Sequence, residues 1–309
     1  MVDIQQNIPL APLTTFKVGG PARYFVAADS EADLAEALNF AREQGLSVFV
    51  LGGGSNILFS DQGFDGLVIK MENRELSLER ECIKVGAGIK LMEVVLFARD
   101  HALAGIESLA GIPGSVGGAI RGNAGAFGAE IGNVVMNVRA FNQVESAVRE
   151  FPLAECEFSY RNSFFKQHRE WLVLSAELQL KPGDKEAIAQ VVDKTVAVRE
   201  SKHPQDAQCA GSFFMNPIVA DMKLREEFER EAGVTCKDNK LPAGWLIDHV
   251  GLRGKKIGGA MVSEIHPNYI LNAGGAKAED IVMLSSVIKQ RVRTQLGVQL
   301  REEVQMVGF

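Results

Sequence analysis

Cysteine and histidine, the residues that most often hold transition metals, are scarce in this sequence. Among 309 residues there are four cysteines and five histidines. No two cysteines form a CxxC pair, and no histidines show the HExxH spacing. Zinc sites and thioredoxin-like redox centres depend on such short spacings. The motifs therefore indicate neither a metal ligand set nor a dithiol centre, and no metal is expected.

Long apolar runs are also missing. No stretch of about 18 consecutive apolar residues occurs, the length that a membrane-spanning helix requires. Residues 1–13 contain an acidic residue and prolines in place of a basic flank and an apolar segment, so no signal peptide is expected. We therefore expect a reduced, cytoplasmic protein that does not associate with a membrane.

A positive net charge is the third feature that the sequence lacks. The 33 lysines and arginines are outnumbered by 39 aspartates and glutamates, which gives a formal net charge of -6. Proteins that bind nucleic acid or acidic membranes over their whole surface need the opposite sign. We expect no nucleic-acid partner, and an anionic substrate would require basic residues that the fold gathers locally.

Hydrophobic and charged residues have the balance of a globular protein, 46% and 23%, and the length suggests about two domains. Ser30 is expected to cap a helix together with Asp33, and Gly45 to end it. Further helices are expected at residues 91–102, 184–199, 221–232, 244–250 and 279–296. Strands are expected at residues 48–51, 67–69, 83–85, 171–180 and 298–307. This mixture indicates the α+β class, with a boundary in the polar stretch 200–208, which carries Pro204.

Two glycine clusters stand out among the 31 glycines. The first, Leu51-Gly52-Gly53-Gly54-Ser55-Asn56, follows an expected strand, and the second covers residues 111–126. Glycine allows the backbone to approach a phosphate closely, and successive amides in a turn form an anion-binding nest. Neither cluster has the GxGxxG or P-loop spacing. Each cluster alone is typical of a tight turn, but two in one chain indicate a long cofactor that carries a diphosphate.

With five shorter motifs, the two clusters resemble the family of UDP-N-acetylenolpyruvoylglucosamine reductases, flavoproteins with the vanillyl-alcohol-oxidase type of FAD-binding fold. Any one motif is weakly specific, but all of them in this order are highly specific. The resemblance extends from Thr14 to Gly308. The five motifs are Thr15-Phe16-Lys17-Val18-Gly19-Gly20, Tyr160-Arg161-Asn162-Ser163, Ala210-Gly211-Ser212-Phe213-Phe214, Ala243-Gly244-Trp245-Leu246-Ile247 and Glu302-Glu303-Val304.

The resemblance implies an α+β fold in which a two-part FAD-binding region is followed by a C-terminal α+β substrate-binding domain. The expected domains are residues 1–78 and 79–200, which bind FAD between them, and residues 201–309, whose last strand returns toward the flavin. Some members carry a tyrosine-bearing insertion that closes over the substrate, and none occurs between Trp171 and Lys202. The chain therefore resembles the shorter type of the family.

The family holds FAD with its two glycine clusters. Neither cluster contains a histidine or cysteine, the residues that tether flavin in many oxidases, so FAD is expected to bind noncovalently. Smaller departures from the family are Arg121, Phe127 and Met215, which leave individual contacts open. The cofactor-binding residues carried over to this sequence are Gly53, Gly54, Ser55, Asn56, Ser115, Gly118, Asn123 and Gly125.

The family reaction reduces UDP-N-acetylglucosamine enolpyruvate to UDP-N-acetylmuramate for peptidoglycan synthesis, and so serves cell-wall growth, cell shape and cell division. NADPH reduces FAD, which passes hydride to the β-carbon, and the α-carbon receives a proton. The electrons move into the neighbouring carboxylate, so the reaction needs positive or hydrogen-bonding groups there and an acid at the α-carbon. Arg161 matches the first role, because its guanidinium fork suits a carboxylate.

Two further residues match catalytic positions of the family. Glu303 matches the C-terminal glutamate, and Glu302 is expected on the opposite face of the last strand. A nearby substrate carboxylate would raise the pKa of Glu303, which could then donate a hydrogen bond to the developing charge. Ser212 matches the proton donor. The substrate-binding residues carried over are Tyr160, Lys202, Asn216 and Asn268.

Two other functions remain open on the same scaffold. A flavin oxidase would use oxygen on an alcohol or sugar, often with FAD tethered to histidine or cysteine. A flavin-binding protein without turnover would act as a sensor or scaffold, and the joint presence of Arg161, Ser212 and Glu303 speaks against it. Adjacent residues on a helix do not face each other, so Asp248 and His249 are not expected to form a dyad. The protein is expected to be a monomer.

Overall fold

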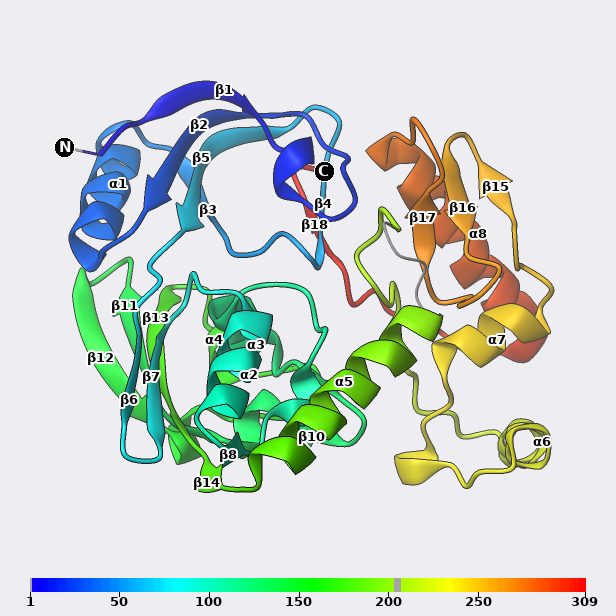
Figure 1. Cartoon of the computed structure of the whole chain (residues 1–309). Coiled ribbons are helices and arrows are strands. Elements are labelled where there is room, and N and C mark those ends of the chain that lie inside the picture. Colours follow the sequence, from blue (N-terminus) through cyan, green and yellow to red (C-terminus); the bar gives the residue numbers. More distant parts are fainter. Residues whose placement is uncertain (1, 203–206) are drawn as a thin grey trace. The chain divides into compact units, whose positions relative to one another are not determined.

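The computed structural model describes residues 2–202 and 207–309, with the backbone alone at Lys202 (Figure 1). The chain forms two compact units. Unit 1 comprises Met1–Ile8, Ala22–Gly54 and Asp65–Ser201, and unit 2 comprises Pro9–Pro21, Ser55–Phe64 and Lys202–Phe309. The boundary expected within 200–208 includes residues 203–206, which lie outside the described residues. The division into three domains at residues 78 and 200 stays a prediction.

Unit 1 contains a four-stranded sheet with one long helix packed on it. Helix α1 (Glu31–Glu43) buries Leu34, Ala37, Leu38 and Ala41 at helical spacing. Its N-terminus has the expected capping box, because Ser30 accepts from the amide of Asp33 and the Asp33 side chain accepts from that of Ser30. The strands lie in the order β1 (Gln5–Pro9), β2 (Pro21–Ala28), β5 (Phe64–Met71) and β3 (Ser47–Leu51).

A five-stranded antiparallel sheet forms the rest of unit 1. One row across it, from Phe151 through Val138 and Ala176 to Val85, is buried. Helices cover this face of the sheet (Figure 1), so the row becomes part of one apolar core. The strands lie in the order β12 (Ala147–Pro152), β11 (Val135–Asn142), β13 (Trp171–Gln179), β7 (Cys82–Gly86) and β6 (Leu76–Glu79). The helices are α2 (Leu91–Asp100), α3 (Val116–Gly122), α4 (Phe164–Gln167) and α5 (Lys185–Lys202).

Unit 2 is built on a small antiparallel sheet and its own helices. The segment Ser55–Phe64 belongs to this unit. The carboxylate of Asp61, in this segment, accepts hydrogen bonds from the amides of Ala278 and Glu279 at 2.9 and 3.1 Å, and so caps the longest helix of the unit. The helices are α6 (Met222–Ala232), α7 (Ala243–His249) and α8 (Ala278–Leu296). The sheet is β15 (Lys256–Ile257), β16 (Ala260–Val262) and β17 (Ile270–Asn272), and β4 (Ile57–Phe59) pairs with β18 (Gln305–Val307).

The remaining elements are short. Two-stranded pairs join β8 (Leu103–Ala104) to β14 (Lys181–Pro182) and β9 (Gly125–Ala126) to β10 (Ala129–Glu130). Single 3-10 turns lie at Ala11–Leu13, Glu107–Leu109, Ile131–Asn133, Leu153–Glu155 and Lys237–Asn239. Within the described part of the chain, no helix combines the length and the apolar character that crossing a membrane demands.

The strand expected at residues 298–307 is wrong in its first part, because only Gln305–Val307 is a strand. The preceding residues instead contact the 213–215 segment, through an isolated bridge between Phe214 and Glu302. Neither Glu302 nor Glu303 faces open solvent; both are half-buried, and Glu302 pairs with Lys289. The expectation that Glu302 and Glu303 lie on opposite faces stays a prediction.

Candidate active site

The two glycine clusters meet in unit 1, backbone against backbone. A Cβ added at Gly53 would lie 2.5 Å from the Cα of Gly114, and one added at Gly52 would lie 2.5 Å from the Oγ of Ser115. Gly114 has a φ of +119°, which side chains rarely allow. Only glycine therefore fits at this junction, and the two loops form one continuous backbone surface.

Ser115 begins the second loop's helix. Its Oγ accepts from the amide of Gly118 at 3.5 Å, as the N-cap residue of α3. Ser115 is buried, whereas Gly53 and Gly118 are exposed. Because the exposed glycines have no Cβ, a ligand can approach the backbone closely beside the buried N-cap residue Ser115. These features fit a cofactor with a diphosphate, such as FAD.

Asn123 organises the loop that follows. Its Nδ2 donates to Glu130 Oε2 at 2.7 Å and to the carbonyl of Ser159 at 3.0 Å, and its Oδ1 accepts from the amide of Gly132 at 3.1 Å. It is 1% exposed and has a left-handed φ of +43°. The side chain is thus occupied by internal hydrogen bonds, so its assignment as a cofactor contact stays a prediction.

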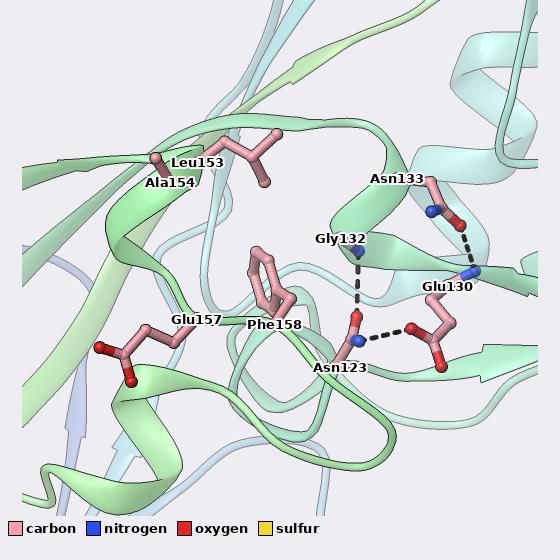
Figure 2. A pocket seen from close by; sticks show the side chains of 8 residues that line it. All are labelled: Asn123, Glu130, Gly132, Asn133, Leu153, Ala154, Glu157 and Phe158. Atoms are coloured by element: carbon pink, nitrogen blue, oxygen red, sulfur yellow. Dashed lines mark hydrogen bonds between the residues drawn. The ribbon is translucent and has the colours of Figure 1, made fainter.

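A cavity of about 380 Å³ lies beside Asn123 (Figure 2). Two of its lining side chains are the carboxylates Glu130 and Glu157. Negative side chains repel an anion. The cavity therefore does not suit a diphosphate. Its lining residues are Asn123, Glu130, Gly132, Asn133, Leu153, Ala154, Glu157 and Phe158.

Arg161 lies in a tight turn next to the second glycine cluster. The turn is closed by two backbone hydrogen bonds between Ser159 and Asn162, at 3.1 and 2.9 Å. Arg161 has a φ of +55°, and its Nη2 donates to the carbonyl of Gly125 at 3.1 Å. Its guanidinium lies over the ring of Tyr160, 5.2 Å from the centroid. A left-handed conformation at a residue that is not glycine is strained, and the hydrogen bonds of this turn hold Arg161 in it.

Other basic side chains gather around this turn, as an anionic ligand would require. Lys166 Nζ donates to the carbonyl of Arg161 at 2.7 Å. Burial, followed by repulsion from Arg169, lowers the pKa of Arg121. An anion beside Arg121 would offset both effects. In the sequence Arg121 differs from the family but carries no other signal, because its neighbours in space are not visible in the local sequence.

In unit 2, the structure brings the segments of Ser212 and Glu303 together. The amide of Glu303 donates to the carbonyl of Phe213 at 2.8 Å. Gly211 turns the chain before Ser212 with a φ of +73°, and Ser212 forms a bridge with Tyr269. The Oγ of half-buried Ser212 makes no hydrogen bond to any residue that the structure describes. This hydroxyl is therefore available to a ligand.

Asn56, from the first glycine cluster, holds the Glu303 segment from the other side. Its Nδ2 donates to the carbonyl of Glu303 at 3.1 Å, and its own carbonyl accepts from the amide of Gln305 at 3.0 Å. The adjacent Ser55 is half-buried, and Gly54 is buried with a φ of +66°. Asn56 thus fixes the backbone at Glu303, a role that the sequence motifs do not predict.

Asn268 holds the Ser212 segment through its amide. Its Oδ1 accepts from the amide of Phe214 at 3.0 Å, and its Nδ2 donates to the carbonyl of Phe214 at 2.8 Å. The Asn268 carbonyl also accepts from the amide of Phe213 at 2.7 Å. The side chain is 4% exposed and both of its polar atoms are used inside the protein. The local sequence around Asn268 carries no sign of this contact.

The other substrate candidates are less constrained by the structure. Asn216 is exposed, and its Oδ1 accepts from the amide of Ala243 at 3.0 Å, at the start of α7. The side chain of Lys202 lies outside the described residues. Asp248 and His249 do not pair with each other, as expected, because Asp248 binds Arg253 Nη2 at 2.7 Å.

Comparison with known proteins gives matches along the whole chain. Residues 22–147 match a family described as FAD binding domain, and residues 203–307 match one described as UDP-N-acetylenolpyruvoylglucosamine reductase, C-terminal domain. A UDP-N-acetylenolpyruvoylglucosamine reductase of Solibacter usitatus is 40% identical, covering 99% of this chain and 97% of the relative. Reductase 1 of Bacillus anthracis is 36% identical, with 97% and 93% covered. The crystal structure of the Thermus caldophilus reductase has a TM-score of 0.78 at 30% identity, covering 99% of both chains.

Proposed function

The chain belongs to the family of UDP-N-acetylenolpyruvoylglucosamine reductases, and from this we propose that Arg161, Ser212 and Glu303 carry out its chemistry. The protein is a flavin-dependent oxidoreductase of peptidoglycan precursor synthesis, a UDP-N-acetylmuramate dehydrogenase that uses FAD and NADPH. Its substrate is UDP-N-acetylglucosamine enolpyruvate and its product UDP-N-acetylmuramate. Bound FAD supplies the hydride that is added to the β-carbon of the enolpyruvyl group.

Arg161 stabilises the charge that develops on the substrate carboxylate. Its fork of donors suits a carboxylate, and the neighbouring basic residues increase the local positive potential. The turn between Ser159 and Asn162 holds the Arg161 backbone in place before the substrate arrives. A donor that is oriented in advance needs little reorganisation during the reaction, which is the usual source of large electrostatic effects.

Ser212 delivers a proton to the α-carbon, and Glu303 donates a hydrogen bond to the developing dianion. Serine is a weak acid, but the carbanion is a strong base, so transfer in this direction is favourable. The observation that carries the assignment is the hydrogen bond from the Glu303 amide to the Phe213 carbonyl, which holds the Glu303 segment beside the residue that follows Ser212. Asn56 and Asn268 position these two segments through the backbone.

We assign the remaining candidates to two groups. Gly53, Gly54, Ser55, Asn56, Ser115, Gly118, Asn123 and Gly125 belong to the flavin site, with backbone amides as the main contacts. Tyr160, Lys202 and Asn216 bind the sugar nucleotide, and Asn268 acts by holding the Ser212 segment. The proposal includes a cytoplasmic monomer without a nucleic-acid or membrane partner, and light scattering in solution tests the oligomeric state.

An anaerobic titration tests the proposed function against an oxidase and against a flavin-binding protein without turnover. NADPH should bleach the flavin absorbance, and the enolpyruvyl substrate should restore it without oxygen. An oxidase would recover its colour only with oxygen. A protein without turnover would not recover with the enolpyruvyl substrate, and that result would remove the proposed reaction.

Noncovalent attachment of FAD is tested by acid precipitation. The glycine clusters contain no histidine or cysteine that could tether the flavin. We therefore expect all the yellow colour in the supernatant. Colour that remains in the pellet would contradict this part of the proposal.

A further inference from the structure

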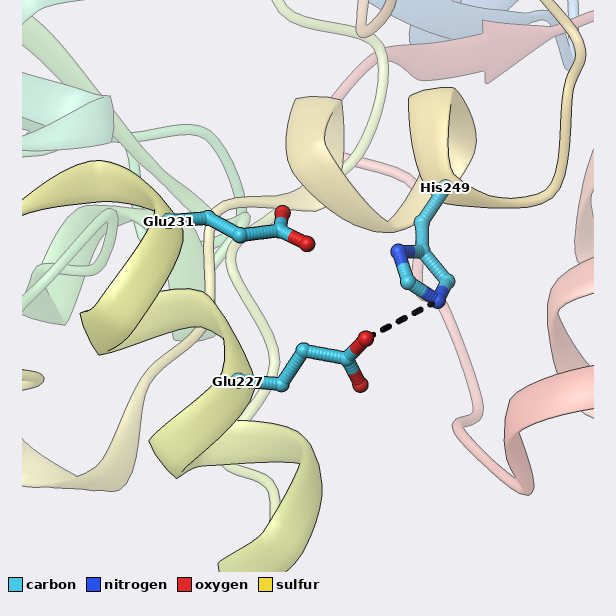
Figure 3. A group of neighbouring side chains, drawn as sticks. All are labelled: Glu227, Glu231 and His249. Carbon is cyan, nitrogen blue, oxygen red and sulfur yellow. Dashed lines mark ion pairs between the residues drawn. The ribbon is translucent and has the colours of Figure 1, made fainter.

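Three side chains from two neighbouring helices of unit 2 point toward one another (Figure 3). Glu227 and Glu231 lie one turn apart on α6, and His249 is the last residue of α7. One donor atom from each side chain lies within 4.8 Å of the other two. His249 Nε2 and Glu227 Oε1 are 4.0 Å apart, an ion-pair distance that is too long for a hydrogen bond.

The two carboxylates have little internal compensation. Within the described part of the chain, no lysine or arginine forms an ion pair with Glu227 or Glu231. One oxygen of Glu231 accepts from the indole Nε1 of Trp245 at 2.9 Å, and the ring of His249 packs on Trp245 at 4.7 Å. Such contacts orient ligand side chains around a metal ion. A cation would relieve the repulsion between the carboxylates.

The backbones that carry these side chains are fixed by packing. Phe228 on α6 and Trp245 on α7 meet edge to face at 5.5 Å. Leu246 and Ile247 on α7 are fully buried. Ligands bound at about 2.1 Å lie roughly 3 to 3.5 Å apart around one ion. The donors lie within 4.8 Å of one another, so the site requires the two glutamates and the histidine to rotate closer together.

We propose that Glu227, Glu231 and His249 bind one divalent transition-metal cation, such as Zn²⁺, which links α6 to α7. The imidazole selects this class, because Mg²⁺ and Ca²⁺ prefer sites made entirely of oxygen. Sequence motifs predicted no metal site, because the three ligands come from two helices and do not form a short motif in the sequence. The cation stabilises the helix pair beside Asn216, whose Oδ1 accepts from the first amide of α7.

Calorimetric titration of metal-free holoenzyme with Zn²⁺ tests the site. Cys82 and Cys236 are half-buried free thiols, and thiolates are zinc ligands, so both are first replaced by serine in every protein compared. We expect one Zn²⁺ per chain, and Glu227→Gln, Glu231→Gln and His249→Gln should each weaken binding at least about tenfold, since even outer-shell partners contribute that much. His168→Gln is the matched control, because His168 and Glu170 form an exposed pair at 3.2 Å.

A second measurement locates the ion. Trp171→Phe leaves Trp245 as the single tryptophan of the chain, and Ni²⁺ at the site should quench its fluorescence until Zn²⁺ displaces it. Zn²⁺ should also raise the melting temperature, and His249→Gln should abolish the rise. Unchanged Zn²⁺ affinity in any of the three ligand variants overturns the proposal. Equal affinity for Mg²⁺ and Zn²⁺ also overturns the proposal, because it indicates only an acidic patch. The absence of binding at about 1 mM Zn²⁺ overturns it as well.

Discussion

In unit 1 the glycine loops at Gly53 and Gly114 touch through bare backbone, whereas in unit 2 asparagine side chains hold the segments of Ser212 and Glu303, Asn268 the first and Asn56 the second. The first arrangement excludes any added side chain, because the contact leaves no space for a Cβ. The arrangement in unit 2 depends on two asparagines, each of which donates a hydrogen bond and accepts one. A glycine junction suits a surface that a long cofactor follows, and an amide clamp suits two reactive side chains that need fixed positions.

Ser212→Ala should have the largest effect, on one half of the reaction alone. Flavin bleaching by NADPH needs no proton at the α-carbon, so its rate should not change. Reoxidation by the enolpyruvyl substrate should slow about 100-fold to 10,000-fold, as for loss of a general acid. Stopped-flow absorbance separates the two steps, and Ser212→Cys should recover much of the activity. Equal reoxidation rates in wild type and Ser212→Ala would end the assignment.

Arg161→Lys examines the corresponding group in unit 1. Lysine keeps the charge but lacks the bidentate fork, and it cannot reproduce the contact to Gly125 with the same geometry. Turnover of the enolpyruvyl substrate should fall at least about 100-fold, the scale of losing one oxyanion donor. Flavin reduction by NADPH should change little. Near-normal turnover would remove Arg161 from the mechanism.

Gly53→Ala tests the glycine junction. Its Cβ would lie 2.5 Å from the Gly114 Cα, so the backbone must shift. We expect a loss of about 1 to 3 kcal/mol in the free energy of unfolding and weaker FAD binding, measured by thermal unfolding and flavin release. Gly122→Ala is the control, since nothing lies within 4 Å of its Cβ position. Equal behaviour of the two variants would show that the junction tolerates a side chain.

Asn268→Ala tests the amide clamp. It leaves the buried amide and carbonyl of Phe214 without their partner, which should cost about 1 to 3 kcal/mol in the free energy of unfolding. The reoxidation step should slow, because Ser212 loses its support. Chemical denaturation and substrate titration measure the two effects. A raised KM with unchanged stability would instead identify Asn268 as a direct substrate ligand.

Asp280→Asn should have the smallest effect, and one that depends on pH. Hydrogen bonds from the amides of Lys277 and Gly259, at 3.0 and 3.1 Å, lower the pKa of Asp280. The stabilisation is therefore present above the pKa of an unfolded aspartate, about 3.9, and is lost as the pH falls through the lower folded value. Near neutral pH the variant should lose less than about 1 kcal/mol of unfolding free energy. Unfolding curves should converge below about pH 4; a constant difference would exclude the carboxylate charge as the cause.

The sequence by itself determined the family, the order of its motifs and most of the helices, although α3 and α4 were not expected. The capping box of Ser30 and Asp33 is confirmed, and α2, α6 and α8 begin within one residue of the expected positions. Caps and helical periodicity depend on residues a few positions apart, so the local sequence contains them. The mixture of helix and strand signals along the chain likewise predicted the α+β class.

Only the tertiary structure decided which groups surround each candidate. The clamp of Asn268 on Phe214 joins residues 54 positions apart, and the bond from Asn56 to Glu303 joins residues 247 positions apart. The segment before Gln305 likewise has a distant partner, the 213–215 segment, and not a neighbouring strand. Such pairs arise when buried backbone groups must find partners within the folded chain. Spacing along the sequence carries no record of that requirement, so Glu227, Glu231 and His249 also became a cluster only on folding.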